Sequence, residues 1–324
     1  MILVTGSSGF VGSAVCRELE LRGSSVLRAV RRHAEPNDAA VVVGDINSKT
    51  EWTEALKRVY AVVHLAARVH QMRDTADDPL EEFRRVNVEG TRRLAEEAVR
   101  TGVKRFVFLS SIKVNGEMTD GVGPFTETDL PHPVDAYGIS KWETEQILRE
   151  IGRRTGMEVV ILRLPLIYGP GVKANFLKLI QHIERGLPLP FGRIQNQRSL
   201  LGLRNLVDLI CCCIEHPSAA GEIFLASDGD DVSTPELVRR IARALGKPVR
   251  LLPVPVWMMG LCGRVTGKSD QLRRLCGSLQ IDSLKVRQVL SWTPPYSISE
   301  ELARVAAWRA ECLTSGMRRT PVHR

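Results

Sequence analysis

Tyr137 and Lys141 stand four residues apart, a spacing that places both side chains on one face of a helix. A fixed ammonium beside a phenol favours the phenolate, so the pattern predicts that Lys141 lowers the pKa of Tyr137 from the ordinary value of about 10. Such a phenol can exchange a proton with a hydroxyl or carbonyl group of a substrate. The alternative is an exposed helix face on which the two residues coincide by chance.

A pair of serines, Ser110-Ser111, closes the apolar segment 106–110, which is predicted to be a strand. In open parallel sheets, ligands bind at the carboxyl ends of the strands. Ser111 is therefore expected to hydrogen-bond the same substrate oxygen that Tyr137 protonates. The serine, the phenol and the ammonium together predict acid/base chemistry.

The amino-terminal run Thr5–Gly12 (TGSSGFVG) contains three glycines and directly follows four apolar residues that form a predicted strand. Residues 11–23 continue as a predicted helix. A strand, a glycine turn and a helix in this order are typical of a dinucleotide-binding loop, where backbone N–H groups approach a pyrophosphate. Glycine turns also occur for steric reasons alone, but this context favours a cofactor. The loop residues expected to hold it are Gly6, Ser8, Gly9, Phe10, Val11 and Gly12.

Strand-like and helix-like segments alternate through the first half of the chain. This alternation predicts an α/β fold, a Rossmann-type doubly wound parallel sheet with a smaller carboxyl-terminal substrate-binding domain. We expect domains over residues 1–165 and 166–324, with a return to the sheet around 200–228. Further predicted strands are 26–30, 40–43, 61–65 and 159–162, and predicted helices are 49–59, 79–100, 136–154, 234–245 and 283–290.

The chain has 324 residues and a formal net charge of +8. A basic balance is typical of proteins that contact nucleic acid, anionic membranes or phosphorylated small ligands, although it can serve solubility alone. Aromatic residues make up 5% of the chain and are not interleaved with a basic run, so no nucleic-acid partner is expected.

Seven cysteines lack the paired spacing of a metal site or a disulfide framework. We therefore expect no metal and a reducing compartment, the cytoplasm. Met1 leads straight into a strand, and no apolar run reaches the ~18–20 residues of a span, so neither a signal peptide nor stable membrane insertion is expected. Residues 251–262 are the most apolar segment and are expected to form a core or dimer-facing helix, with membrane contact the less favoured alternative. Residues 315–324 are expected to be a frayed basic tail.

These motifs occur in the order and spacing of a known family. The chain resembles an extended short-chain dehydrogenase/reductase of the nucleotide-sugar epimerase/dehydratase group. The resemblance implies an NAD(P) cofactor, a UDP-sugar substrate and a homodimer, with Ser111, Tyr137 and Lys141 as catalytic residues. It rests on the glycine loop, His64-Leu65-Ala66-Ala67, Asn87-Val88-Glu89-Gly90-Thr91, Ser110-Ser111, Tyr137 with Lys141, Tyr168-Gly169-Pro170-Gly171 and Leu290-Ser291-Trp292-Thr293-Pro294.

The resemblance also implies roles for individual residues. Tyr137 is the implied acid/base, and Lys141 also holds the nicotinamide ribose. Asn175 and Arg198 match positions that grip the diphosphate of a nucleotide sugar, and a mere surface charge is the less favoured alternative for Arg198. The remaining implied cofactor-binding residues are Asp45, Ile46, Leu65, Ala66, Ala67 and Asn87, where Asp45 could instead cap a helix and Asn87 acts structurally.

Three departures from the family pattern bear on cofactor and reaction. The second predicted strand ends in Arg31 and Arg32 instead of an acid, which favours NADP(H), unless the arginines are merely solvated charges. Ile112 and Lys113 replace the acid pair that sugar 4,6-dehydratases need, so dehydration is disfavoured. Asn115 stands where epimerases commonly have tyrosine, which slightly weakens an epimerase interpretation.

The stretches 110–117 and 168–177 are similar to a bacterial subgroup of 4-ketoreductases that serve surface-polysaccharide and O-antigen synthesis. Our first hypothesis is therefore an NAD(P)-dependent 4-ketoreductase/4-dehydrogenase acting on a UDP-2-acetamido-2,6-dideoxyhexose, which makes UDP-N-acetyl-quinovosamine. The second is a UDP-hexose 4-epimerase acting on UDP-glucose or UDP-N-acetylglucosamine with the same residues. The third is a non-catalytic NAD(P)-sensing protein, which the joint presence of phenol and ammonium disfavours.

Overall fold

The computed structural model describes residues 1–32, 39–69, 78–265, 267 and 269–314. Residue contacts divide the chain into two compact units. The first comprises Met1–Pro165, Leu206–Ser227 and Ile281–Thr293, and the second comprises Leu166–Asn205, Asp228–Gln280 and Pro294–Arg324.

Residues 281–293, expected in the second domain, lie in the first unit. Ile281 forms a bridge with Phe125, and the Nζ atom of Lys285 donates to the carbonyl oxygen of Ile223 at 2.9 Å. These contacts lie far apart in the sequence, which is why local composition did not indicate them.

The first unit is built on a seven-stranded parallel sheet. Its strand order is β3-β2-β1-β4-β5-β6-β9, which confirms the predicted doubly wound Rossmann-type fold. Strands β1 and β4 are buried along their whole length, as expected for a parallel sheet covered on both faces. The strands are β1 (Ile2–Thr5), β2 (Val26–Val30), β3 (Ala40–Val42), β4 (Ala61–His64), β5 (Arg105–Ser111), β6 (Glu158–Leu164) and β9 (Ile223–Leu225).

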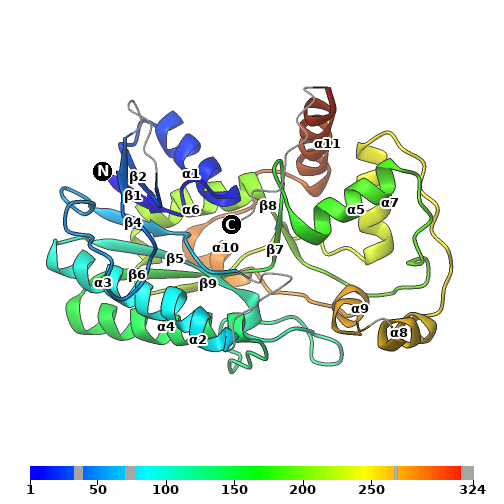
Figure 1. The fold of residues 1–324 in the computed structure, drawn as a ribbon, viewed down its shortest axis with the longest axis horizontal. Coiled ribbons are helices and arrows are strands. Elements are labelled where there is room, and N and C mark those ends of the chain that lie inside the picture. Colours follow the sequence, from blue (N-terminus) through cyan, green and yellow to red (C-terminus); the bar gives the residue numbers. More distant parts are fainter. Residues whose placement is uncertain (33–38, 70–77, 266, 268, 315–324) are drawn as a thin grey trace. The chain divides into compact units, whose positions relative to one another are not determined.

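Helices cover both faces of this sheet. Helices α3 and α4 lie on one face, and α1 and α6 lie on the other (Figure 1). Leu94 and Leu148 bring α3 and α4 into a core that includes Phe106 of β5. The helices are α1 (Phe10–Leu21), α2 (Pro79–Phe83), α3 (Gly90–Arg100), α4 (Ala136–Thr155), α6 (Leu203–Glu215) and α10 (Leu284–Leu290), and short 3-10 helices span Ile112–Val114 and Pro217–Ala219.

Two predicted helices differ from the structure. The helix expected over 79–100 contains a π-helical segment, Arg84–Glu89, between α2 and α3, and such segments often mark functional sites. The helix expected over 49–59 is wrong: these residues form turns. Trp52 and Leu56 are fully buried, whereas Arg58 adopts a left-handed φ of 60° that ends any helical repeat.

The second unit contains a two-stranded parallel sheet and five helices among its described residues. Helix α7 packs against both α5 and α11, and α8 packs against α9. No helix in the described part of the chain has the length and apolar character needed to cross a membrane. The expected tail over 315–324 lies outside the described residues. The elements are β7 (Leu166–Tyr168), β8 (Leu200–Gly202), α5 (Ala174–Glu184), α7 (Thr234–Ala244), α8 (Val256–Val265), α9 (Ser269–Cys276) and α11 (Ile298–Thr314).

Candidate active site

Tyr137 and Lys141 occupy the first turns of α4, whose amino terminus is capped by Asp135. The Nζ atom of Lys141 donates to the carbonyl oxygen of Leu109 at 2.7 Å and lies 4.4 Å from the centroid of the Phe108 ring. The same atom is 5.8 Å from the centroid of the Tyr137 ring. The ammonium therefore links the phenol-bearing helix to the carboxyl end of β5, two residues before Ser111.

The ionisation of this pair differs from the expectation. Burial lowers the pKa of Lys141 to about 7, although the Glu145 carboxylate acts in the opposite direction. Burial raises the pKa of Tyr137, and the charge of Asp135 raises it further. The predicted lowering of the Tyr137 pKa by Lys141 is therefore wrong for the chain by itself, because desolvation of the ring outweighs the ammonium.

Ser111 is held by the turn that follows β5. Its Oγ atom accepts a hydrogen bond from the backbone N–H of Lys113 at 3.3 Å, which caps the short helix Ile112–Val114. The Lys113 ammonium forms an ion pair with Asp135, and Asp135 also accepts from the N–H of Gly138 at 2.7 Å. Lys113 thus connects the turn that holds Ser111 to the start of α4. The amino-acid sequence did not indicate this positioning role.

A buried network connects α4 to strands β5 and β6. Glu145, one helical turn beyond Lys141, forms an ion pair with Arg163 of β6 at 2.7 Å, and neither side chain is more than 2% exposed. Ser110 donates to the same carboxylate, and Arg163 donates to Asn115 Oδ1 at 3.1 Å. Because buried charges need both a partner and hydrogen bonds, this network fixes the register of α4 against β5 and β6.

A second buried chain joins the ends of β1 and β4. His64 Nδ1 lies 2.7 Å from Thr5 Oγ1, and His64 Nε2 lies 2.9 Å from Thr91 Oγ1. Burial lowers the pKa of His64 to about 3, so the ring is neutral. Thr5 Oγ1 also accepts from the N–H groups of Leu65 and Ala66, both at 3.2 Å. The residues expected to line a cofactor channel are therefore held by His64 and Thr5, which belong to the motifs named above but to which the sequence assigned no role.

Asn87 lies in the π-helical segment and acts structurally in this unit. Its Oδ1 atom accepts from the N–H of Arg68 at 2.8 Å, and its Nδ2 atom donates to the Arg68 carbonyl at 3.1 Å. The same Nδ2 atom donates to Ser140 Oγ on α4 at 3.0 Å. The π-helical bulge thus tethers the segment after β4 to the helix that carries the phenol.

The glycine loop is shaped for a close backbone approach. Gly6 has a φ of 66°, and a Cβ atom at Gly12 would lie 2.1 Å from the Gly6 carbonyl oxygen. Helix α1 begins at Phe10 with Gly9 as its N-cap, without a capping side chain or an acidic residue in its first turn. Its first N–H groups therefore offer an uncapped, positive helix end, and these residues fit the pyrophosphate of a dinucleotide.

The residues expected at the adenosine end differ in their partners. Arg31 pairs with Asp45 at 3.0 Å, with both side chains about two-thirds exposed, and Arg32 is exposed. A surface pair of this kind contributes about 0–1 kcal/mol and can rearrange easily. Ile46 packs on α3, because a Cβ atom at Gly90 would lie 2.5 Å from its Cγ2 atom.

The two expected substrate residues of the second unit have different surroundings. Asn175 is exposed in the first turn of α5, next to Ala174, whose φ of 53° is an uncommon, strained conformation for a residue other than glycine. Arg198 Nη1 donates to the carbonyl oxygens of Arg274 at 2.5 Å and Gly277 at 3.1 Å. Arg198 therefore holds the end of α9 in this structure.

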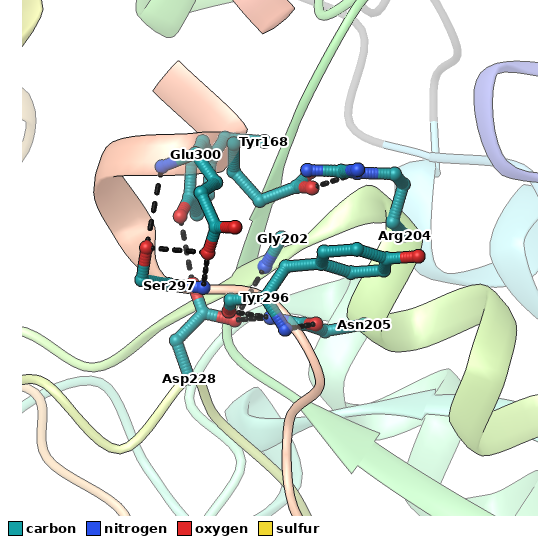
Figure 2. Close-up of polar contacts among 9 residues, drawn as sticks. Tyr168, Gly202, Arg204, Asn205, Asp228, Tyr296, Ser297 and Glu300 are labelled. Atoms are coloured by element: carbon teal, nitrogen blue, oxygen red, sulfur yellow. Dashed lines mark hydrogen bonds and ion pairs between the residues drawn. The ribbon is translucent and has the colours of Figure 1, made fainter. Parts of the chain in front are cut away.

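Tyr168, of the motif Tyr168-Gly169-Pro170-Gly171, belongs to a buried cluster of the second unit (Figure 2). Its hydroxyl donates to Asp228 Oδ2 at 2.8 Å, and burial together with Asp228 raises the pKa of Tyr168. Asp228 Oδ1 also accepts from the Gly202 N–H and from Asn205 Nδ2. The Tyr168 ring stacks on Phe176 of α5 at 5.6 Å. The cluster therefore connects β7, β8 and the start of α5.

The sheet order, the glycine loop and the tyrosine–lysine helix together define a Rossmann-type protein of the short-chain dehydrogenase/reductase class. Comparison with known proteins specifies the class further. The model of the NAD dependent epimerase/dehydratase family matches residues 2–226, so the chain belongs to this family.

Among curated relatives, UDP-glucose 4-epimerase of Vibrio cholerae is 48% identical over 308 residues, which cover 94% of each protein. N-acetyl-alpha-D-glucosaminyl-diphospho-ditrans,octacis-undecaprenol 4-epimerase of Escherichia coli O157:H7 is 28% identical over 94% of this chain and 93% of its own length. A short-chain dehydrogenase/reductase superfamily protein from Agrobacterium tumefaciens, solved with bound NAD, is 26% identical with a TM-score of 0.77, covering 98% of this chain and all of its own. MoeE5 in complex with UDP-glucose and NAD is 27% identical with a TM-score of 0.76, covering 96% of this chain and 99% of its own.

Proposed function

We propose that this protein is an NAD-dependent UDP-hexose 4-epimerase that interconverts the C4 epimers of UDP-glucose or UDP-N-acetylglucosamine. The observation that carries the proposal is the 48% identity, over 94% of both chains, with a relative named UDP-glucose 4-epimerase. MoeE5, whose structure was solved in complex with UDP-glucose and NAD, supports the same substrate class and cofactor. The tyrosine–lysine helix beside the carboxyl end of β5 supplies the required acid/base group.

In this proposal Tyr137, as phenolate, accepts the proton of the sugar C4 hydroxyl while a hydride leaves C4. After the 4-keto sugar has turned over in the site, the hydride returns to the opposite face of C4, and Tyr137 returns the proton to the oxygen. Bound NAD supplies the hydride acceptor and donor. Ser111 hydrogen-bonds the C4 oxygen. Protonated Lys141 favours the Tyr137 phenolate and so opposes the rise in the Tyr137 pKa that burial causes. Asn175 and Arg198 are proposed contacts of the UDP diphosphate.

The relatives support the epimerase better than the 4-ketoreductase that the sequence favoured. Asn115 does not weigh against an epimerase, because its side chain is 2% exposed and is already hydrogen-bonded to Arg163 and to the Thr126 carbonyl oxygen. A preference for NADP(H) has no support from the two solved relatives, which were determined with bound NAD. We propose NAD, the cofactor present in both solved relatives, and the exposed Arg31–Asp45 pair does not decide between NAD and NADP.

The test is to incubate the purified protein with UDP-glucose, and separately with UDP-N-acetylglucosamine, without added cofactor. Proton NMR then follows the anomeric signals of the galacto epimers, and nucleotide released by denaturation identifies the resident cofactor. We expect epimer formation, NAD in the released fraction and no net consumption of added NADPH. Tyr137→Phe should lose at least ~100-fold in kcat, the contribution typical of a positioned acid/base.

Tyr60→Phe is the matched control, because Tyr60 is 43% exposed and lies at the opposite end of β4 from the site. It should retain the wild-type rate. Stoichiometric NADPH oxidation by a UDP-4-keto sugar, with no epimer formed from either UDP-hexose, would return the assignment to the ketoreductase. Full activity of Tyr137→Phe would refute both enzymatic hypotheses.

A further inference from the structure

Helix α8 of the second unit turns large apolar side chains towards solvent. Trp257 is 71% exposed, Met258 is 42% exposed and Leu261 is 57% exposed. Leu252 and Val256, just before and at the start of the helix, are 46% and 43% exposed and extend the same surface. We call these five residues the α8 patch. The core alternative expected for 251–262 is therefore wrong for this part of the segment, and the dimer-facing alternative stays a prediction.

The outward orientation follows from how α8 packs. Met259 and Gly263, one turn apart, are buried on the side that faces α9, and the two helices lie side by side (Figure 1). A Cβ atom at Gly263 would lie 2.7 Å from Leu272 of α9, so the glycine allows a close helix contact. Trp257 and Leu261 are four residues apart and project together from the other side.

The segment that carries the patch is basic. Residues 246–269 include two lysines and two arginines but no aspartate or glutamate. Arg264 lies one turn beyond Leu261 and is exposed, as is Arg273 on α9. An exposed apolar helix face that includes tryptophan and ends at an arginine is suited to the headgroup region of a bilayer, where tryptophan and basic residues are enriched.

We propose that the α8 patch docks this protein onto an anionic phospholipid surface. A second copy of the chain is a poorer occupant, because it would place two positive segments against each other. At ten residues α8 is about 15 Å long, roughly half of a bilayer core, so the helix lies in the interface and does not span it. This inference does not depend on the proposed activity.

The test is co-sedimentation of the full-length protein with vesicles of phosphatidylcholine alone or of phosphatidylcholine mixed with phosphatidylglycerol. We expect binding to the anionic vesicles and a loss of binding at about 1 M salt, where charges are screened within ~3 Å. Trp257→Ser/Leu261→Ser should reduce partitioning at least about tenfold, because each removed side chain forfeits its apolar burial.

Leu21→Ser/Leu284→Ser is the matched control, since these side chains are 73% and 54% exposed on other helices of the chain. It should bind as the wild type does. A shift of tryptophan emission to shorter wavelength on addition of anionic vesicles, lost in Trp257→Phe, locates the contact. Circular dichroism verifies that each variant is folded.

Three results would overturn the proposal. The first is equal partitioning of the patch variant and the wild type. The second is binding to neutral vesicles that is as strong as binding to anionic ones. The third is gel filtration in which only the patch variant becomes smaller while vesicle binding is unchanged, which would assign the α8 patch to a second copy.

Discussion

The buried pair of Glu145 and Arg163 makes a prediction that joins stability to ionisation of the site. Glu145 is fully buried, pairs with Arg163 at 2.7 Å and raises the pKa of Lys141 against the effect of burial. Glu145→Gln keeps the size and the hydrogen-bonding capacity of the side chain but removes its charge. The variant therefore leaves the Arg163 guanidinium without its counter-ion. It also removes the negative charge that raises the pKa of Lys141.

The stability effect is large, because removing one partner of a buried ion pair costs about 3–5 kcal/mol. The second effect concerns Lys141, whose pKa is about 7, so that about a quarter of it is protonated at about pH 7.5. Losing the nearby carboxylate lowers this pKa further, by on the order of one pH unit. The protonated fraction at about pH 7.5 then falls about eightfold.

Urea denaturation measures the first effect, and the pH dependence of kcat for epimerisation measures the second. We expect the alkaline limb of the profile to move to lower pH, with activity recovering as the pH is lowered. Glu143→Gln is the control, because Glu143 lies on the same helix and pairs with Arg84, but both side chains are partly exposed. That variant should change the free energy of unfolding by about 0–1 kcal/mol and leave the pH profile unchanged.

Two outcomes would refute this reasoning. If Glu145→Gln is no less stable than Glu143→Gln, the buried pair does not hold α4 against β6. If the alkaline limb stays in place or moves to higher pH, Glu145 does not support the charge of Lys141.

Two further predictions concern the cofactor loop and the buried histidine. Gly12→Ala places a Cβ atom 2.1 Å from the Gly6 carbonyl oxygen, so the purified variant should release no NAD on denaturation. Gly260→Ala is the control, because the space around its Cβ position is open, and this variant should release as much NAD as the wild type. Equal amounts of NAD released from the two variants would contradict the prediction. The pKa of His64 is about 3 in the folded state, against an ordinary value of 6.5. Between these two pH values His64 is protonated only in the unfolded chain, so the free energy of unfolding falls as the pH falls. Between about pH 6.5 and pH 4.5 the wild type should lose about 2–3 kcal/mol more than His64→Gln in urea denaturation, and parallel losses would contradict a neutral buried ring.

The fold could be predicted because its signals are local. Four apolar residues followed by TGSSGFVG specify a strand, a turn and a helix through backbone sterics and solvent exclusion alone. The same holds for the placement of Tyr137 and Lys141 on one helix face, which follows from 3.6 residues per turn. The helix over 49–59 failed because burial of Trp52 and the left-handed backbone at Arg58 are set by packing, which local propensity does not contain.

The amino-acid sequence by itself determined the sheet class and the glycine loop, and it predicted Tyr137 and Lys141 as an acid/base pair on one helix face. Only the tertiary structure decided which charged side chains are buried together and which helix faces are exposed to solvent. Glu145 and Arg163 are eighteen residues apart along the chain, and their pairing depends on how α4 crosses β6. Burial raised the pKa of Tyr137, whereas the sequence predicted a lower pKa. The packing of α8 against α9 left Trp257 exposed to solvent. Desolvation and long-range pairing depend on three-dimensional neighbours, so no pattern in the linear sequence encodes them directly.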